Sequence, residues 1–232
     1  MPAYKEEEFI QNTLEEFLKT FRKYEIDFEI LVIIDVILND STLEIAKRIA
    51  TSSKEIIIIE RHGKQGIGSA IREGIKVASK NTVIIATAEV SEDPEDLVLM
   101  VLKMNDGYDM VFGNRFFRGA KREGYSLKKY IGNRLCNYAI KILFGIKSQD
   151  ITNGIKVYKT SILKEMKTTS VGFEIFAEMP LTAYMNGYTN FIEIPIKHKA
   201  RDNIYSKFNL TKEGCRFFST VMKCFFQKNF SK

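Results

Sequence analysis

Cysteine and histidine are scarce in this sequence of 232 residues. It contains three cysteines, Cys136, Cys215 and Cys224, and two histidines, His62 and His198. Three scattered cysteines are too few for a disulfide framework or a thiolate metal site. The two histidines lie too far apart in the chain to indicate a metal pair or a catalytic dyad. We therefore expect free thiols, buried where they fall in the last helix, and a reducing, cytosolic setting.

Long apolar runs are missing as well. No stretch approaches the roughly 20 apolar residues of a membrane-spanning helix, and the start of the chain lacks a signal-peptide pattern. There are no internal repeats, no low-complexity segments and no linker rich in proline or serine. The sequence therefore predicts one domain over residues 1–232, cytoplasmic and, if it works at a membrane, peripheral to it.

Cations are in excess. The formal net charge is +6 and the pI is about 9.0, while the 45% apolar and 28% charged fractions are ordinary for a globular chain. Such a charge makes an anionic partner plausible, whether a nucleotide, a lipid phosphate, a membrane surface or nucleic acid. Aromatic residues do not alternate with basic ones as in a nucleic-acid-binding module, so we expect no nucleic acid partner.

Apolar runs and helical periodicity alternate along the chain. They predict strands over 28–34, 55–59, 82–86, 108–113, 154–158 and 191–197, and helices over 8–23, 42–50, 66–79, 94–104, 127–144, 173–187 and 210–226. Strands rich in β-branched residues, separated by amphipathic helices, indicate a parallel sheet covered on both faces. The strand at 82–86 runs out into carboxylates, and ligands of open α/β sheets bind at such strand ends.

Five short motifs carry a resemblance to a known family. In chain order they are Pro2-x-Tyr4-x-Glu6, Ile34-Asp35 with Asp40 and Thr42, Gly66-x-Gly68-x-Ala70, Thr87-Ala88-Glu89, and Gly113-x-Arg115. In this order they resemble the inverting GT-A glycosyltransferases of family 2, most closely the dolichyl- or polyprenyl-phosphate mannose and glucose synthases. The resemblance covers nearly the whole chain.

The resemblance implies an α/β, GT-A (Rossmann-like) three-layer fold with a mainly parallel central sheet. Residues 1–113 would form a nucleotide-binding half, and residues 114–232 an acceptor-binding half with a C-terminal amphipathic helix. The family has a full strand before the motif that begins at Pro2, whereas this sequence begins at Met1. We therefore expect a truncated first strand.

The resemblance assigns the nucleoside to the turn that contains Pro2, Tyr4 and Glu6. A ring and a carboxylate suit this role, one stacking on the base and the other accepting hydrogen bonds. The alternative is an ordinary helix N-terminal turn, in which acidic residues offset the helix dipole. Ile34 and Ala88 are further candidates for contacts with the nucleotide.

The second motif departs from the family pattern. Asp35 is kept as a nucleotide-binding candidate, but Val36 replaces the second of two adjacent aspartates and removes a polar contact. The residues Asp40-Ser-Thr42 that follow are expected to serve as a helix N-cap. The small residues from Gly66 to Gly74 are expected to let a helix start close to the sheet, which makes them evidence for the fold.

In the family, an Asp-x-Asp motif holds a divalent metal, Mg or Mn, against the phosphates of the sugar nucleotide. Here Thr87 stands at the first aspartate and Glu89 at the second, with Ser91 as a further oxygen donor. A hard cation held by oxygen ligands neutralises the leaving diphosphate. The alternative is that Glu92 and Asp93, ahead of Pro94, simply begin a helix.

The remaining site candidates come from the second half of the chain. The resemblance places Arg115 beside the phosphates, Asp150 and Glu178 near the reacting groups together with Glu89, and Arg201 and Lys207 in a loop over the nucleotide phosphates. Asp150 and Lys156 would form a pair beside the acceptor or, alternatively, a local salt bridge. Phe225 and Phe226, with flanking lysines, are candidates for lipid contact.

The implied activity is transfer of a hexose from GDP-mannose or UDP-glucose to a polyprenyl or dolichyl phosphate at the cytosolic membrane face. A membrane-spanning partner subunit is compatible with this activity. The substitutions Val36 and Thr87 leave an alternative open: a catalytically impaired protein of the same fold that binds nucleotide, lipid phosphate or a partner enzyme. The sequence does not specify the sugar, the base or the lipid.

Overall fold

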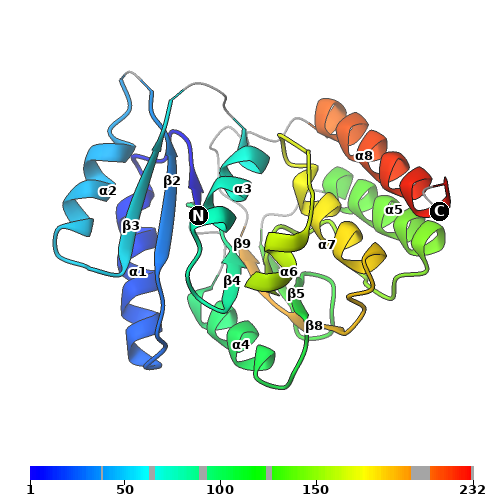
Figure 1. Cartoon of the computed structure of the whole chain (residues 1–232), viewed down its shortest axis with the longest axis horizontal. Helices are drawn as coiled ribbons and strands as arrows, with labels where there is room; N and C mark the ends of the chain where they lie inside the picture. Colours follow the sequence, from blue (N-terminus) through cyan, green and yellow to red (C-terminus); the bar gives the residue numbers. More distant parts are fainter. Residues whose placement is uncertain (38, 63–65, 89–92, 124–126, 200–209, 231–232) are drawn as a thin grey trace.

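The computed structural model describes residues 1–37, 39–62, 66–88, 93–123, 127–199 and 210–230 (Figure 1). The first half alternates strands and helices: β1 (Pro2–Ala3), α1 (Ile10–Lys23), β2 (Ile30–Asp35), α2 (Thr42–Ala50), β3 (Ile56–Arg61), α3 (Ile67–Val77), β4 (Thr82–Ile85), α4 (Pro94–Met104) and β5 (Met110–Asn114). The second half contains β6 (Lys121–Glu123), α5 (Leu127–Phe144), β7 (Lys156–Lys159), α6 (Thr160–Glu165), α7 (Ile175–Met185), β8 (Phe191–Pro195), β9 (Lys197–Lys199) and α8 (Leu210–Phe230). The predicted α/β alternation is confirmed.

The strands form two main hydrogen-bonded sheets. One is parallel and has the order β1-β2-β3, and the other has the order β4-β7-β5-β8. Parallel pairs predominate as predicted, while β7 is antiparallel to both of its neighbours. The first strand is short, as predicted, and its two residues mark the place where the two sheets separate. The short strands β6 and β9 pair beside them.

Helices cover the sheets from both sides and form three layers. Buried side chains of α1, α2 and α4 belong to one apolar core, and those of α3, α6 and α7 to another. A third core joins α5, α7 and α8 at the end of the molecule that carries the C-terminus (Figure 1). No helix in the described ranges is both long and apolar enough to cross a membrane.

The cysteines of α8 differ from each other. Cys224 is buried in the core between α5, α7 and α8, as predicted for a thiol in this helix. Cys215 is exposed, so the same prediction is wrong for it. The reason is its position on the helix surface, two residues before the buried Phe217 and therefore on a different face.

The glycine-rich segment brings α3 close to two different neighbours. A side chain at Gly74 would place its Cβ 2.9 Å from Ile33 Cδ1 on β2, in line with the expected close packing on the sheet. At Gly68, however, a Cβ would lie 2.3 Å from the carbonyl oxygen of Ser170. The Gly68 N–H also donates to Val171 O at 2.8 Å, so the start of α3 packs on a loop of the second half.

We expect Gly68→Ala to lower the free energy of unfolding by about 1–3 kcal/mol, because the added methyl group meets backbone that must shift. Gly132→Ala is the matched control. Gly132 lies inside α5 with open space around its Cα, so this change should raise stability by about 0.5–1 kcal/mol. Urea unfolding of both variants tests the pair, and equal effects would contradict the close approach at Gly68.

Candidate functional site

The turn after β1 lies against the start of α2. Ala3 pairs with Ile34 across the parallel ladder, which brings the ends of β1 and β2 together. The Glu6 N–H donates to Thr42 Oγ1 at 2.8 Å, and Thr42 Oγ1 donates to the Asp40 carboxylate at 2.9 Å. The side chain of Tyr4 is exposed beside this turn. The turn predicted to bind the nucleotide is thus held in place by Asp40 and Thr42 of the second motif.

The prediction that Asp40-Ser-Thr42 forms the N-cap of α2 is confirmed for the position of the cap but not for a side-chain hydrogen bond. The N-cap of α2 is Ser41, and its side chain makes no capping hydrogen bond. Instead, the Glu7 carboxylate accepts a hydrogen bond from the Ser41 N–H at 2.9 Å. The Thr42 hydroxyl accepts a hydrogen bond from the Glu6 N–H in the turn after β1, so it connects α2 to that turn.

The segment that follows β4 is hydrogen-bonded to α1. The Thr13 hydroxyl lies 2.9 Å from the Ala88 carbonyl oxygen and 3.0 Å from that of Phe9. Ala88 is buried, and Thr87 just before it is half-buried. The predicted nucleotide contacts at Tyr4, Glu6 and Ala88 are therefore grouped at one end of the sheets, where the strand ends meet.

Asp35 is held by Arg61, a residue without a role among the sequence predictions. Asp35 Oδ1 lies 2.8 Å from Arg61 Nε, and both side chains are buried. Burial raises the pKa of Asp35 above its usual range, and the Arg61 charge opposes that shift. The two residues stand opposite each other at the ends of β2 and β3. Opposite charges at the ends of neighbouring predicted strands are the signal that could have found the pair.

The candidate metal ligands lie mostly outside the described residues. Glu89 and Ser91 fall there, as do Arg201 and Lys207, so their assignments stay predictions. Among the residues that are described, no three His, Cys, Asp or Glu side chains lie together so that they could hold a metal. Thr87 provides a neutral oxygen at the end of β4. The alternative for the acidic segment is confirmed in part, because the Asp93 side chain caps α4 through the Glu95 N–H at 2.9 Å.

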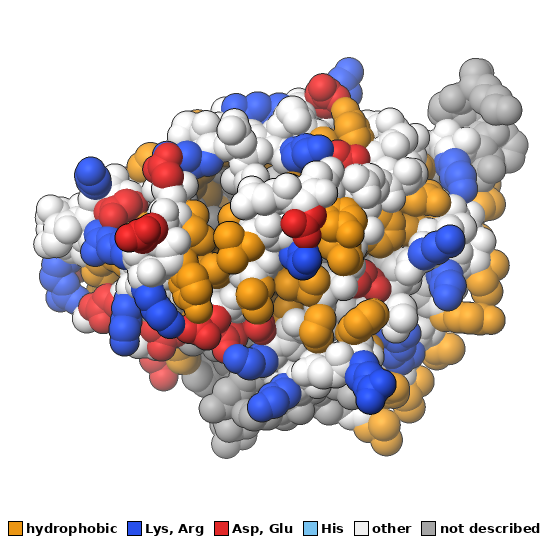
Figure 2. All heavy atoms as spheres, turned by 90° about the horizontal axis from the view of Figure 1, so that it is seen from below, with side chains coloured by type: hydrophobic (Ala, Val, Ile, Leu, Met, Phe, Trp, Pro, Cys, Tyr) orange, Lys and Arg blue, Asp and Glu red, His pale blue; other side chains and the backbone are white. Residues whose placement is uncertain are grey.

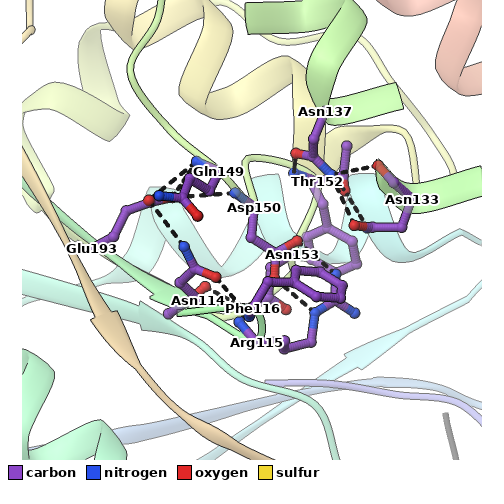
Figure 3. Close-up of polar contacts among 12 residues, drawn as sticks. Asn114, Arg115, Phe116, Asn133, Asn137, Gln149, Asp150, Thr152, Asn153 and Glu193 are labelled. Atoms are coloured by element: carbon purple, nitrogen blue, oxygen red, sulfur yellow. Dashed lines mark hydrogen bonds and ion pairs between the residues drawn. The ribbon is translucent and has the colours of Figure 1, made fainter. Parts of the chain in front are cut away.

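A second polar centre lies at the end of β5 (Figure 3). Arg115 and Asp150 form a two-pronged ion pair, with Nε–Oδ2 and Nη2–Oδ1 distances of 2.9 Å each. The Arg115 N–H also donates to Asp150 Oδ2 at 3.1 Å. The Asp150 side chain is completely buried and that of Arg115 is 12% exposed. Paired hydrogen bonds of this kind fix the orientation of a guanidinium.

Glu193 on β8 organises the loop that leads to Asp150 (Figure 3). Its carboxylate accepts hydrogen bonds from Asn114 Nδ2 at 3.0 Å, Ser148 Oγ at 2.6 Å and the Asp150 N–H at 3.2 Å. Glu193 and Asn114 are not among the site residues predicted from the sequence. The available signal was a carboxylate within the otherwise apolar stretch Phe191-Ile-Glu-Ile.

Helix α5 joins the same centre. Asn133 Nδ2 and Asn137 Nδ2 both donate to Thr152 Oγ1, at 2.9 and 3.0 Å. Arg134 Nη1 donates to the carbonyl oxygen of Gln149 at 2.7 Å. One face of α5 is therefore tied to the loop that carries Asp150 (Figure 3).

Glu178 is buried and already has partners. Its carboxylate accepts hydrogen bonds from the backbone N–H groups of Thr169 at 3.0 Å and Ser170 at 2.8 Å. These contacts hold the loop against which Gly68 packs. They give Glu178 a structural role, and its predicted place near the reacting groups stays a prediction.

The comparison with known sequences decides the family. The model of Glycosyl transferase family 2 matches residues 1–167. The chain belongs to glycosyl transferase family 2. The predicted resemblance is thereby confirmed, over most of the chain.

Two relatives of this family 2 chain are polyprenyl-phosphate sugar transferases. It is 28% identical over 163 residues to a dolichyl-phosphate hexose transferase of Haloferax volcanii, covering 70% of this chain and 67% of that protein. It is 23% identical over 175 residues to a polyprenol monophosphomannose synthase of Mycolicibacterium smegmatis, covering 72% and 66%. The matched part thus spans about two thirds of the length of each relative.

A solved structure confirms the predicted fold class. Glucosyl-3-phosphoglycerate synthase from Mycobacterium tuberculosis, in complex with Mn²⁺ and UDP-glucose, superposes with a TM-score of 0.74 at 14% identity. The match covers 96% of this chain and 76% of that one. At 14% identity, this match supports a shared fold and says nothing about function.

Lys156 is buried beside the Arg115–Asp150 pair. Its Nζ donates to the carbonyl oxygens of Asn153 and, at 3.2 Å, Phe176. Burial lowers the pKa of Lys156 from 10.5 to about 7. The predicted pair of Asp150 with Lys156 is wrong, because the carboxylate is taken up by Arg115, which reaches it from the end of β5.

Lys156→Met is expected to remove a pH dependence of stability. Between about pH 7 and pH 10.5 the unfolded chain keeps the Lys156 proton that the folded protein has released. The unfolded state then binds more protons, so this group makes stability rise with pH across that window. Urea unfolding at about pH 7 and about pH 9.5 should show a steeper rise for the native protein than for the variant. Equal slopes would contradict the burial of a neutral amine.

Proposed function

We propose that this family 2 protein transfers a hexose, mannose or glucose, from a nucleotide sugar to a polyprenyl or dolichyl phosphate at a membrane surface. The main observation in favour of a lipid acceptor is that α5 contacts the polar centre with one face and exposes apolar side chains on another. One face of this helix is tied to the Arg115–Asp150 centre, and the opposite face is exposed and apolar. The activities of the two relatives named above support the same acceptor class.

The nucleotide would lie over the ends of β1, β2 and β4. The exposed Tyr4 ring is placed to stack on the base, and Glu6 and Asp35 supply carboxylates beside the ribose or base. Pro2, Ile34 and Ala88 form the apolar and backbone floor of this region, where Pro2 pairs with Ile33 and Ala3 with Ile34. GDP-mannose and UDP-glucose are the two donors to compare.

Arg115 would face the phosphates, with Arg201 and Lys207 as further cations from the late loop. A phosphate monoester is anionic near neutral pH, so its oxygen can attack the anomeric carbon without a strong base. The bond from that carbon to the nucleoside diphosphate breaks in line with the attack. Orientation and charge stabilisation would carry the rate. Asp150 keeps Arg115 in one orientation, while Glu178 would act through the loop at 169–170.

A divalent metal, Mg or Mn, belongs to this proposal. Glu89 would hold it, with Thr87 and Ser91 as further oxygen donors. When bound, such an ion neutralises the charge that develops on the leaving diphosphate. One carboxylate and neutral hydroxyls form a weaker donor set than two carboxylates, so the affinity for metal should be low.

The exposed face of α5 supports work at a lipid surface. Leu127, Ile131, Leu135, Tyr138 and Ile142 are each at least half exposed. At about 100° per residue they fall within roughly 80° of one another on the helix, as one stripe. Figure 2 shows hydrophobic side chains next to Lys and Arg at the end of the molecule that carries α5 and α8. An apolar stripe with basic neighbours suits an interface with anionic lipid.

The terminal helix adds less to this surface than the sequence predicts. Phe226 is exposed, but Phe225 is partly buried and packs 6.2 Å from the Phe144 ring. Lys228, one of the flanking cations, donates to the Phe144 carbonyl oxygen at 3.0 Å. Phe218 supplies a further exposed ring on α8. We therefore assign the main lipid contact to α5.

A second candidate function is binding without transfer. Asp35 is engaged by the buried Arg61, Val36 replaces a carboxylate of the family, and Thr87 replaces another. A protein with these changes would bind a nucleotide, a lipid phosphate or a partner enzyme through its cations alone. Nucleotide binding that is independent of metal and leads to no turnover would favour this function over the first.

The transfer activity is tested with the purified protein, GDP-mannose or UDP-glucose, a short polyprenyl phosphate, and Mg²⁺ or Mn²⁺. We expect metal-dependent formation of polyprenyl-phosphate hexose. Glu89→Ala should lower the rate at least about tenfold, the lower end of the cost of changing groups around a metal site. Thr87→Asp should increase the affinity for metal because it adds a second carboxylate.

Glu95→Ala is the matched control for Glu89→Ala. Glu95 lies in the same acidic stretch, but its carboxylate is exposed and pairs with Lys23 at 2.9 Å. The control should keep full activity. If Glu89→Ala also left metal binding and transfer unchanged, the assigned metal position would be wrong.

Membrane contact is tested by changing the α5 stripe. The double variant Leu135→Glu/Ile142→Glu should bind vesicles containing anionic phospholipid at least about tenfold more weakly, because two apolar side chains leave the lipid interface. Leu99→Glu is the matched control, since Leu99 is also exposed but lies on α4. Vesicle co-sedimentation measures both, and equal loss in the two variants would refute the assignment to α5.

A further inference from the structure

The chain passes from β8 to β9 at Ile196 and Lys197, and both residues are bonded to other elements. The Ile196 N–H donates to the carbonyl oxygen of Asn114, the last residue of β5, at 3.2 Å. The Lys197 N–H donates to Asp96 Oδ2, in the first turn of α4, at 2.6 Å. The ends of β5 and β8 and the start of α4 therefore meet at these two residues.

A second carboxylate at the start of α4 holds the same lysine. Asp93 Oδ2 lies 2.6 Å from Lys197 Nζ, while Asp93 Oδ1 accepts the Glu95 N–H and caps the helix. Asp96 thus binds the backbone of Lys197, and Asp93 binds its side chain. We call Asp93, Asp96 and Lys197 the α4–β9 clamp.

Asp96 is an unfavourable residue for packing alone. Its side chain is buried, and burial raises the pKa of its carboxyl. Lys197 opposes this shift through its N–H and through its charge. An apolar side chain would fill the same space without the cost of burying a charge. The contribution of this carboxylate is therefore to orient the chain at Lys197.

The clamp lies next to the segments that carry the proposed phosphate contacts. Along the sequence, Glu89 precedes Asp93 by four residues, and Arg201 follows Lys197 by four. Arg115 comes directly after the last residue of β5. The clamp thus fixes α4, β5 and β9, the elements adjacent to these three candidates in the chain, relative to one another.

We propose that Asp96 and Lys197 are positioning residues for the diphosphate of the sugar nucleotide. This role rests on the function proposed above. Neither residue would touch the ligand; both set the spacing between Glu89 and the cations Arg115 and Arg201. A diphosphate held from three segments depends on that spacing, because a misplacement of about 1 Å can cost about 100-fold in a positioned reaction. The nucleoside, at the turn after β1, would not depend on the clamp.

The test compares Asp96→Ala with Asp96→Asn, whose amide oxygen can still accept the Lys197 N–H. Calorimetric titration with GDP and UDP, and with guanosine and uridine, is carried out in the presence of Mn²⁺. Asp96→Ala should weaken binding of the preferred diphosphate at least about tenfold and change that of its nucleoside by less than about twofold. Asp96→Asn should restore most of the diphosphate affinity.

Lys197→Met is the milder variant, in case Asp96→Ala does not fold. It should weaken diphosphate binding about two- to fivefold, the range expected for a partly exposed ion pair. Lys103→Met is the matched control, since Lys103 lies at the other end of α4 and pairs with Asp106 at 2.8 Å. Its side chain is 47% exposed and that of Lys197 is 53% exposed. The control should bind the diphosphate as the native protein does.

Three outcomes would overturn the proposal. The first is an equal loss of nucleoside and diphosphate affinity in Asp96→Ala, because the residue would then act on the whole fold. The second is the absence of any rescue by Asp96→Asn. The third is equal diphosphate affinity in Lys197→Met and Lys103→Met. Sugar transfer by the native protein is measured separately, so a protein that binds the diphosphate without transfer still tests the clamp. No diphosphate binding by the native protein would refute the proposed function and this role together.

Discussion

The ion pair between the buried Asp150 carboxylate and Arg115 is the interaction on which the polar centre at the end of β5 depends. The carboxylate takes three hydrogen bonds from Arg115, at the end of β5, and the Asp150 N–H is bonded to Glu193 on β8. A buried charge is tolerated only when it is paired and hydrogen-bonded, so each of these partners must be in place for the others to be stable. The orientation of the guanidinium is thus fixed before any ligand arrives.

The two ends of the site are built on different physical terms. The proposed nucleotide end includes backbone contacts, in which Thr13 and Thr42 use their hydroxyls to fix the segments that follow β4 and β1. The proposed acceptor end depends on charge, with Arg115, Asp150 and Glu193 close together and shielded from solvent. At the proposed nucleotide end, a change of Thr13 or Thr42 therefore alters shape. Loss of Arg61 there, or of Arg115 at the proposed acceptor end, leaves a buried carboxylate without its partner.

The sequence predicted the elements better than the contacts among them. The helices α2, α4 and α5 have the predicted bounds because periodicity and flanking polar residues are local signals. The strand β6 and the helix α6 were missed because three to six residues carry too little periodicity. Family resemblance indicated Arg115 and Asp150 as site residues, but it did not indicate that they pair with each other. This pairing depends on strand register, which local patterns do not encode. The same holds for the pairs Asp35–Arg61 and Asn114–Glu193.

The position of β7 has a consequence for how the chain folds. Strands β4 and β5 come from the first half, yet β7, which lies between them, is made only after residue 155. Strands β1 to β3 can pair as soon as they are synthesised, whereas the second sheet has to wait for a distant segment, which is a slow, high-contact-order step. The end of β4 should therefore become ordered late in folding. The two halves of the chain are partners in one folding unit and not successive ones.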